Sequence, residues 1–294
     1  MKTNDIKTNC IISILALILS LIGFNEKVSA QSNNEVSFYL QGSFSKLKYE
    51  ALGRDSGLEN GFGIGGKYSY YINDSWSIGT GAEIQYIEGS IFVPTVEGSY
   101  IIQDGEFEEF EFRYRATNFS ENQEAYFLNI PVQVQYETSG TIRFYTTAGI
   151  KAGIVLSTKY QSSASSLETS GYYSQYDVEL TSPEFAGFGE FRELGTSWSE
   201  PKLTTNFVAH MESGMKLMLE NNNSLYMGFF LDYGLNKIQP DHTRAKLVNY
   251  NNRNPTDFTL GSILTASRDG NSSQFVNEVR TIAFGLKIRY GFQF

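Results

Sequence analysis

The stretch Thr281-Ile-Ala-Phe-Gly-Leu-Lys-Ile-Arg-Tyr-Gly-Phe-Gln-Phe294 decides the fold class of this chain. Large apolar side chains occupy every second position from Ile282 to Phe294, and small, charged or amide side chains lie between them. Because successive side chains of a strand point to opposite faces, this spacing separates an apolar face from a polar face. A long strand of this kind that ends on an aromatic residue is typical of a strand between lipid and a polar interior.

Seven further segments repeat the alternation, so the sequence predicts an all-β chain. Tight turns rich in residues that tolerate turn geometry join three pairs of neighbouring segments. The other four connectors are longer, and we refer to them as the first to fourth long connectors. The seven segments are 36–44, 62–72, 76–86, 126–136, 142–156, 207–219 and 225–235; the turns are 73–74, 138–140 and 220–223; the long connectors are 46–57, 89–122, 157–203 and 239–274.

Short and long connectors alternate along the whole chain, as expected when short turns face the periplasm and long loops face outward. An even number of strands also places both termini on the short-turn side. The sequence therefore predicts an eight-stranded antiparallel up-and-down transmembrane β-barrel with long extracellular loops, formed by residues 31–294 as one domain. The terminal Phe294 is the candidate assembly signal of this barrel.

The first thirty residues have the layout of a secretory signal. Two lysines and an apolar run from Ile11 to Phe24 precede Val28-Ser29-Ala30. We expect cleavage after Ala30, so residues 1–30 form the signal peptide. The single cysteine, Cys10, leaves with this segment, which excludes disulfides and thiolate metal sites from the mature chain.

Composition agrees with a barrel and excludes other classes. Beyond Phe24 the sequence has no long, uniformly apolar stretch, so transmembrane helices are not expected. A barrel crosses the membrane with short alternating segments, which the 22 Phe, 19 Tyr and 27 Gly of the chain fit. The mature chain has 20 Lys and Arg against 30 Asp and Glu, a net charge near −10, which argues against a nucleic-acid partner.

A soluble barrel that holds its apolar face inward around a ligand would show the same alternation. The polar face favours the membrane alternative, because it interleaves opposite charges with glycines, as a crowded interior requires. The other face is almost purely aliphatic and aromatic, with Trp76, Tyr136, Tyr233 and Tyr290 near strand ends, where aromatic belts lie. We therefore expect the apolar face to lie in the lipid of a Gram-negative outer membrane.

The segment Tyr126-Phe-Leu-Asn-Ile-Pro-Val-Gln-Val-Gln-Tyr136 resembles the fourth strand of the outer-membrane β-barrel, porin-like (PorT-like) proteins of Bacteroidota. An aromatic residue, then Ile-Pro, then alternating residues and a Tyr recur in that family. The aromatic last residue and the eight strands agree with it, while the extended second to fourth long connectors depart from it. The resemblance implies the fold and a place in secretion or envelope assembly.

Charged residues on the polar face form the first candidate site. Paired charges that close the lumen are the expected arrangement, because an eight-stranded barrel leaves little more room than its side chains fill and unpaired buried charge is costly. The alternative is a narrow, mildly anion-favouring pore for small solutes. The predicted lumen network comprises Lys67, Glu83, Arg143, Lys151, Glu212, Lys216, Asp232, Lys287 and Arg289.

The two histidines are the residues on which an enzyme at the barrel rim would depend. His210 lies on the polar face beside Glu212, and His242 lies in the fourth long connector beside Asp241. Neither accompanies a recognisable nucleophile or ligand motif. We expect structural or solvated histidines, no catalytic residue, no cofactor and no metal site.

The second and third long connectors carry most of the negative charge, with seven acids and two bases in the second and seven acids and three bases in the third. In the second, Asp104-Gly105 between alternating runs predicts a hairpin that extends two barrel strands above the membrane. This hairpin has one charged and one aromatic face. The aromatic face either packs on aromatic residues of the third long connector or forms an exposed partner surface of Tyr100, Phe110, Phe112 and Tyr114.

The leading functional expectation is a non-enzymatic structural or interaction protein. Its barrel would contact outer-membrane lipid and lipopolysaccharide, and its acidic, aromatic-rich long loops would contact a protein partner in an envelope or secretion complex. Fold and activity are separable, so the small-solute pore and the rim enzyme remain as alternatives.

Overall fold

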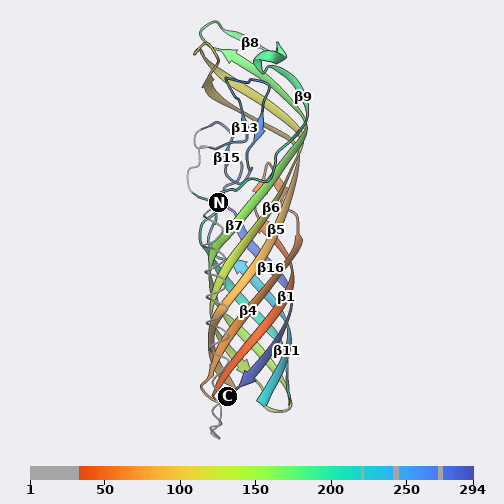
Figure 1. Cartoon of the computed structure of the whole chain (residues 1–294), viewed down its shortest axis with the longest axis vertical. Coiled ribbons are helices and arrows are strands. Elements are labelled where there is room, and N and C mark those ends of the chain that lie inside the picture. The colour runs from red at the N-terminus through yellow and green to blue at the C-terminus, as the bar shows by residue number, and fades with distance from the viewer. Residues whose placement is uncertain (1–32, 220–221, 241–244, 271–273) are drawn as a thin grey trace, which may run out of the picture. The chain divides into compact units, whose positions relative to one another are not determined.

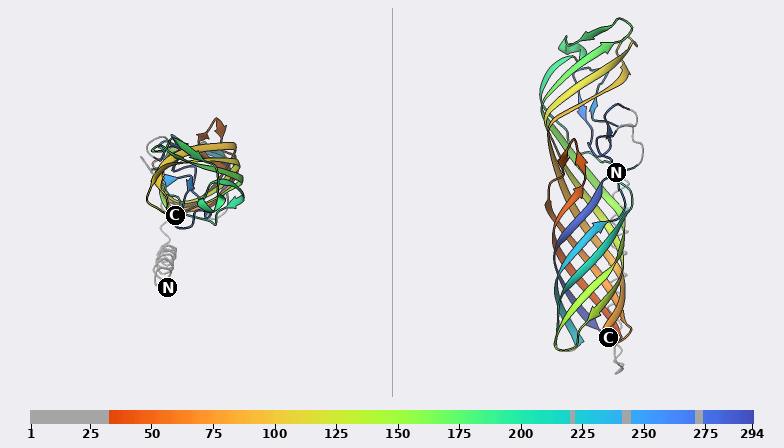
Figure 2. Two further views of the ribbon diagram at one scale, coloured as in Figure 1. Left: turned by 90° about the horizontal axis from the view of Figure 1, so that it is seen from above. Right: turned by 180° about the vertical axis from the view of Figure 1, so that it is seen from behind.

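The computed structural model describes residues 33–219, 222–240, 245–270 and 274–294 (Figures 1 and 2). The expected signal peptide and His242 lie outside the described residues. Among the described residues, no helix is long and apolar enough to cross a bilayer.

Eight long strands form a closed antiparallel ring in sequence order (Figure 1). The ring closes where the first and last strands pair, from Glu35 opposite Gln293 to Lys48 opposite Arg280. These strands are the eight predicted segments, so the up-and-down barrel is confirmed. They are β1 (Asn34–Lys48), β4 (Glu59–Tyr71), β5 (Trp76–Gln103), β6 (Glu109–Glu137), β7 (Ile142–Tyr173), β10 (Asn206–Met218), β11 (Asn223–Gly234) and β16 (Arg280–Gln293).

The outward face of the ring is apolar and the inward face is polar, as the alternation predicted. Outward side chains such as Leu40, Val132 and Phe229 are 62%, 60% and 71% exposed, whereas inward Lys151 and Glu83 are buried. An apolar belt on this scale is stable only against hydrocarbon, so the barrel is transmembrane. Trp76 and Tyr86 bound the belt on β5, and ten strand residues at a tilt near 40° cover about 25 Å, the usual height of such a belt.

Aromatic residues on neighbouring strands mark both borders of the belt. At the short-turn end, the Trp76 and Tyr136 rings lie 5.1 Å apart. At the other end, the centroid of the Tyr86 ring lies 5.3 Å from that of Phe62 and 4.9 Å from that of Tyr126. Aromatic girdles of this kind lie at the two membrane interfaces.

Beyond the Tyr86–Tyr126 border the same strands exchange their polarity. On β6, outward Val132 and inward Gln133 are replaced further up by outward Arg115 and inward Phe112. Two backbone features of β6 change which face its side chains occupy. One is a register irregularity between Tyr126 and Phe127, and the other is Asn118, whose φ of 50° is left-handed. The exchange indicates that the outer solvent changes from lipid to water at this border.

Strands β5, β6 and β7 therefore continue well past the barrel as one sheet (Figure 2). The predicted hairpin is confirmed, with a turn at Asp104 whose N–H bonds to the Glu108 carbonyl. The second long connector is mostly strand, as the hairpin predicted, and the third, expected to be a loop, is also mostly strand. The sheet is completed by β8 (Val178–Leu180) and β9 (Gly189–Gly195), which both pair with β7; a 3₁₀ turn, η1 (Glu184–Ala186), lies between them.

The apolar core of the protein lies in this extension rather than in the barrel. The fourth long connector packs on the inward face of the sheet and contributes Leu247, Leu260 and Ile263, all buried. We call residues 87–125, 157–195 and the described residues of 238–279 the distal module. Its short strands, and those of the first long connector, are β2 (Glu50–Ala51), β3 (Arg54–Asp55), β12 (Ala245–Lys246), β13 (Val248–Asn249), β14 (Thr259–Leu260) and β15 (Ala266–Ser267).

Candidate functional site

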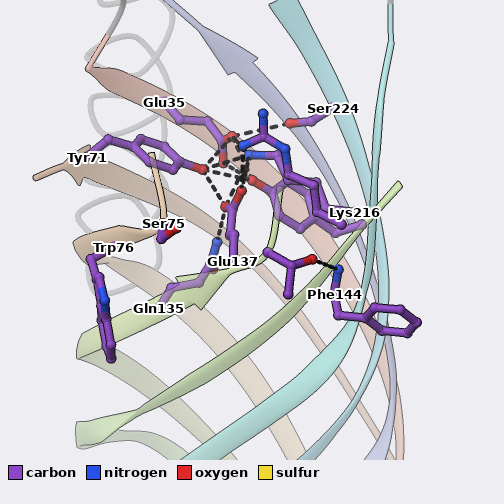
Figure 3. Close-up of polar contacts among 12 residues, drawn as sticks. Glu35, Tyr71, Ser75, Trp76, Gln135, Glu137, Phe144, Lys216 and Ser224 are labelled. Atoms are coloured by element: carbon purple, nitrogen blue, oxygen red, sulfur yellow. Dashed lines mark hydrogen bonds and ion pairs between the residues drawn. The ribbon is translucent and has the colours of Figure 1, made fainter. Parts of the chain in front are cut away.

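The lumen near the short-turn end is filled by a buried cluster of two acids, one lysine and two tyrosines (Figure 3). The Lys216 Nζ atom lies 3.0 Å from Glu137 Oε2 and 3.4 Å from Glu35 Oε2. The Tyr71 hydroxyl donates to Glu137 at 2.7 Å, and the Tyr226 hydroxyl donates to Glu35 at 2.7 Å. Every carboxylate here therefore has charged and neutral donors.

A second layer lies deeper in the barrel. The guanidinium of Arg289 stacks on Tyr226 at 3.8 Å and donates to Gln135 at 2.9 Å. Glu212 accepts hydrogen bonds from Lys287 at 3.0 Å and from Tyr145 at 2.7 Å. Lys67 also donates to Gln135, at 3.0 Å, so Lys67 and Arg289 share this acceptor.

The third layer centres on Lys151, whose Nζ lies 2.9 Å from both Glu83 and Asp232. The Nδ1 atom of His210 lies 2.6 Å from Asp232, and the Tyr39 hydroxyl donates to Glu83 at 3.0 Å. His210 is buried within this paired network.

The structure brings all nine predicted lumen residues into this network. Eight are buried, and Arg143 lies at the short-turn end, 3.4 Å from Glu137 and 24% exposed. The prediction missed Glu35 and Glu137, which add two acids to the three that were expected. Both residues continue the polar phase of their strands, just outside the segments that we outlined, so longer segment limits would have found them.

The lumen side chains also press against the barrel wall. A Cβ atom on Gly65 would lie 2.5 Å from the Tyr39 ring, and one on Gly79 would lie 2.6 Å from the Lys67 side chain. At Gly65 the Tyr39 ring and the Ala82 carbonyl oxygen leave no space for a Cβ atom, whereas at Gly79 the Lys67 side chain would have to shift. This packing favours a closed lumen over an open pore.

The predicted partner surface of Tyr100, Phe110, Phe112 and Tyr114 is wrong, because all four side chains are buried in the distal module. Burial of the aromatic side of the sheet removes more apolar area from water than burial of the charged side would. The charged side therefore faces water. The four residues face the fourth long connector, a neighbour that the sequence did not predict.

Aromatic residues of the third and the fourth long connectors pack on this face of the hairpin. Phe110 stacks on Tyr173 at 5.2 Å and meets Phe188 edge-on at 5.6 Å, both in the third. Phe112 lies 5.2 Å from Tyr250 of the fourth, whose backbone N–H donates to the Tyr100 hydroxyl at 2.9 Å. The alternative prediction, packing on the third long connector, is therefore correct for only part of this face.

Glu121 is the polar anchor between the sheet and the fourth long connector. Its buried carboxylate accepts hydrogen bonds from Ser262 Oγ and the Ile263 N–H, each at 2.7 Å, and from Ser162 Oγ and Gln123 Nε2. No ion pair to this carboxylate is present among the described residues. Burial raises the pKa of the Glu121 carboxyl above its ordinary value, an effect that the four donors oppose.

The predicted assembly signal, Phe294, lies at the surface. Phe294 is 62% exposed, and its N–H donates to the Asn34 carbonyl at the short-turn end. Its role as an assembly signal stays a prediction. In the part of the chain that the structure describes, no group of three or more His, Cys, Asp or Glu side chains is arranged to hold a metal ion.

No family model matches this chain, and no curated protein matches its sequence. Among solved structures, the chain is similar to the outer membrane protein OprG from Pseudomonas aeruginosa, at 10% identity and a TM-score of 0.36 over 91% of this chain and 99% of that one. It is also similar to Neisserial surface protein A, at 12% identity and a TM-score of 0.31 over 86% and 95% of the two chains. The attachment invasion locus protein Ail of Yersinia pestis matches at 10% identity and a TM-score of 0.30, over 88% of this chain and 99% of Ail. At these scores the likeness carries no functional argument.

Proposed function

We propose that this chain is a non-enzymatic outer-membrane barrel that holds the distal module at the cell surface, where the module contacts a partner protein of the envelope. In this proposal the signal peptide delivers the chain to the periplasm, both termini stay there, and the long strands point outward. The resemblance to PorT-like proteins supports a place in an envelope or secretion complex.

One observation carries the proposal: β5, β6 and β7 cross the membrane border without a break and then form a sheet with its own apolar core. A pore needs an open lumen, whereas the described lumen is occupied by paired charges. An anchor needs a rigid link between the membrane part and the exposed part, and continuous strands with inter-strand hydrogen bonds supply it.

Purification of the full chain in gentle detergent, with identification of bound proteins, tests this function. The module core variant carries Phe112→Asp and Tyr250→Asp. It places two charges in the core of the distal module and should abolish binding of the partner. The matched control, Ser139→Asp and Thr141→Asp, adds the same charges to an exposed turn at the other end. A heat-dependent shift in electrophoretic mobility reports that the barrel is folded in each variant.

Planar-bilayer recording decides between the anchor and the pore. The closed lumen predicts no steady single-channel current from the purified chain. A steady open current, or retention of every bound protein by the core variant, would contradict the proposal. Substitution of His210 with assay of lipid A acylation tests the non-enzymatic part, and a change in acyl content would refute it.

A further inference from the structure

A groove of about 1110 Å³ runs over the outward, water-facing side of the distal module. Strands β5, β6 and β7 supply its floor, β8 and β9 one wall, and the segment at Arg268 the other. The groove is larger than most small-molecule pockets and open along its length, which suits a segment of a polymer.

Each of the two arginines in the floor lies between two glutamates. Arg113 contacts Glu111 at 2.6 Å and Glu179 at 3.3 Å. Each set of three side chains thus holds one negative charge in excess, because a single cation serves two anions.

The second set has the same form: Arg115 contacts Glu97 at 2.7 Å and Glu168 at 3.8 Å. Glu97, Glu168 and Glu179 are 58%, 56% and 44% exposed, so their remaining acceptor positions face solvent. Carboxylates in this state accept additional hydrogen bonds from ammonium or guanidinium groups.

The surroundings of the groove extend this negative potential. Besides Glu111 and Glu179 of the Arg113 set, residues 101–112 and 174–191 contain seven acids and neither Lys nor Arg. Such a potential attracts cations and repels anionic lipid, nucleic acid and a second acidic module.

Strand β8 forms the border of the groove beyond β7. It is the last strand in the sheet order, so one of its edges has no strand partner among the described residues. Glu179 of this strand lines the groove, whereas Val178 and Leu180 alternate with it and lie on the other face of the strand. This free edge is the one opposite β7, so it borders the groove rather than lining it.

We propose that this groove binds an extended, Lys- and Arg-rich segment of a partner protein. The inference rests on the proposed function, because it assigns the partner-binding surface of the distal module. Glu97 and Glu168 of the floor and Glu179 of β8 hold the cationic side chains of this segment.

The test compares the wild type with two variants of the full chain in detergent. The groove variant carries Glu97→Gln, Glu168→Gln and Glu179→Gln. The control carries Glu50→Gln, Glu200→Gln and Asp257→Asn, which remove three exposed acids outside the groove lining. The probes are fluorescent peptides of one length that alternate Val with Lys, Gln or Glu, and fluorescence anisotropy gives each Kd.

We expect the Lys peptide to bind the wild type and the control equally, and the groove variant about tenfold more weakly. Added salt should weaken binding to the wild type and the control. Equal binding of the Lys peptide by the groove variant, equal binding of the Gln and Lys peptides, or self-association of the chain through this face would overturn the groove assignment.

The co-purified protein separates this inference from the proposed function. If the groove variant keeps a partner that the module core variant loses, the anchor function stands and the groove assignment fails. If no partner is found and the Lys peptide still binds as expected, the groove assignment stands and the partner part of the proposed function fails.

Discussion

Replacement of Lys151 by Met should strongly destabilise the barrel. The Lys151 side chain is 1% exposed and lies 2.9 Å from Glu83 and from Asp232, whose side chains are 0% and 4% exposed. At this distance and an effective dielectric constant near 20, each pair contributes about 6 kcal/mol of attraction before desolvation. Removal of the cation leaves two buried carboxylates facing each other, and such losses reduce the free energy of unfolding by about 3–5 kcal/mol.

Equilibrium unfolding of the barrel in urea, with refolding into lipid vesicles, measures this change. Lys159→Met on the same strand is the control, because Lys159 is exposed and its loss should change the free energy of unfolding by less than about 0.5 kcal/mol. The triple variant Lys151→Met, Glu83→Gln, Asp232→Asn should recover most of the lost stability, since it removes the anions as well. A Lys151→Met barrel within about 1 kcal/mol of wild type would refute the reasoning, because only a wet, screened lumen tolerates that change.

Three further predictions concern the membrane border and the distal module. Val132→Arg, on the lipid face of β6, should cost about 2–4 kcal/mol of unfolding free energy in vesicles, whereas Asn122→Arg above the border should cost less than about 0.5 kcal/mol. Phe112→Ala should remove about 3–5 kcal/mol from the module core, and limited proteolysis should then cut the module while the barrel stays intact. Since the folded-state pKa of Glu121 is raised, the folded module binds this proton more tightly than the unfolded chain. Module stability should therefore increase as pH falls through that pKa, and Glu121→Gln should remove this dependence, as read from amide exchange at Ile263.

Each of the three has a result that contradicts it. Equal costs for the two arginines on β6 would place the lipid border elsewhere. Loss of the barrel together with the module in Phe112→Ala would show that the two parts do not unfold separately. Amide exchange at Ile263 that speeds up as pH falls, after correction for intrinsic exchange rates, would reverse the sign argued for Glu121.

Much of the barrel was predictable because its signal is local. The alternation at residues 126–136 predicted both the strand and the side of each residue, and the turn at 138–140 followed from residues that tolerate tight turns. The polar positions of the same alternation identified the residues of the lumen network. Glu35 and Glu137 were missed only because strand ends are the least certain part of such a prediction.

The distal module was harder to predict because apolar side chains face lipid on one side of the Tyr86–Tyr126 border and face inward on the other. The adjacent apolar pairs Tyr86-Ile87 and Tyr126-Phe127 interrupt the alternation, and in each pair the first residue faces lipid while the second faces inward. These pairs mark the polarity exchange in the sequence. They do not reveal which distant segment covers the inward face.

The amino-acid sequence by itself determined the eight barrel strands, their two faces and the alternation of turns, since these depend on neighbouring residues and on strand geometry. Only the tertiary structure decided that Phe112 is buried rather than available to a partner, and that Glu121 anchors the fourth long connector. The physical reason is that burial depends on which surfaces meet. Residues 110–121 and 250–263 meet through the fold of the whole chain, a relation that no periodicity within either segment contains.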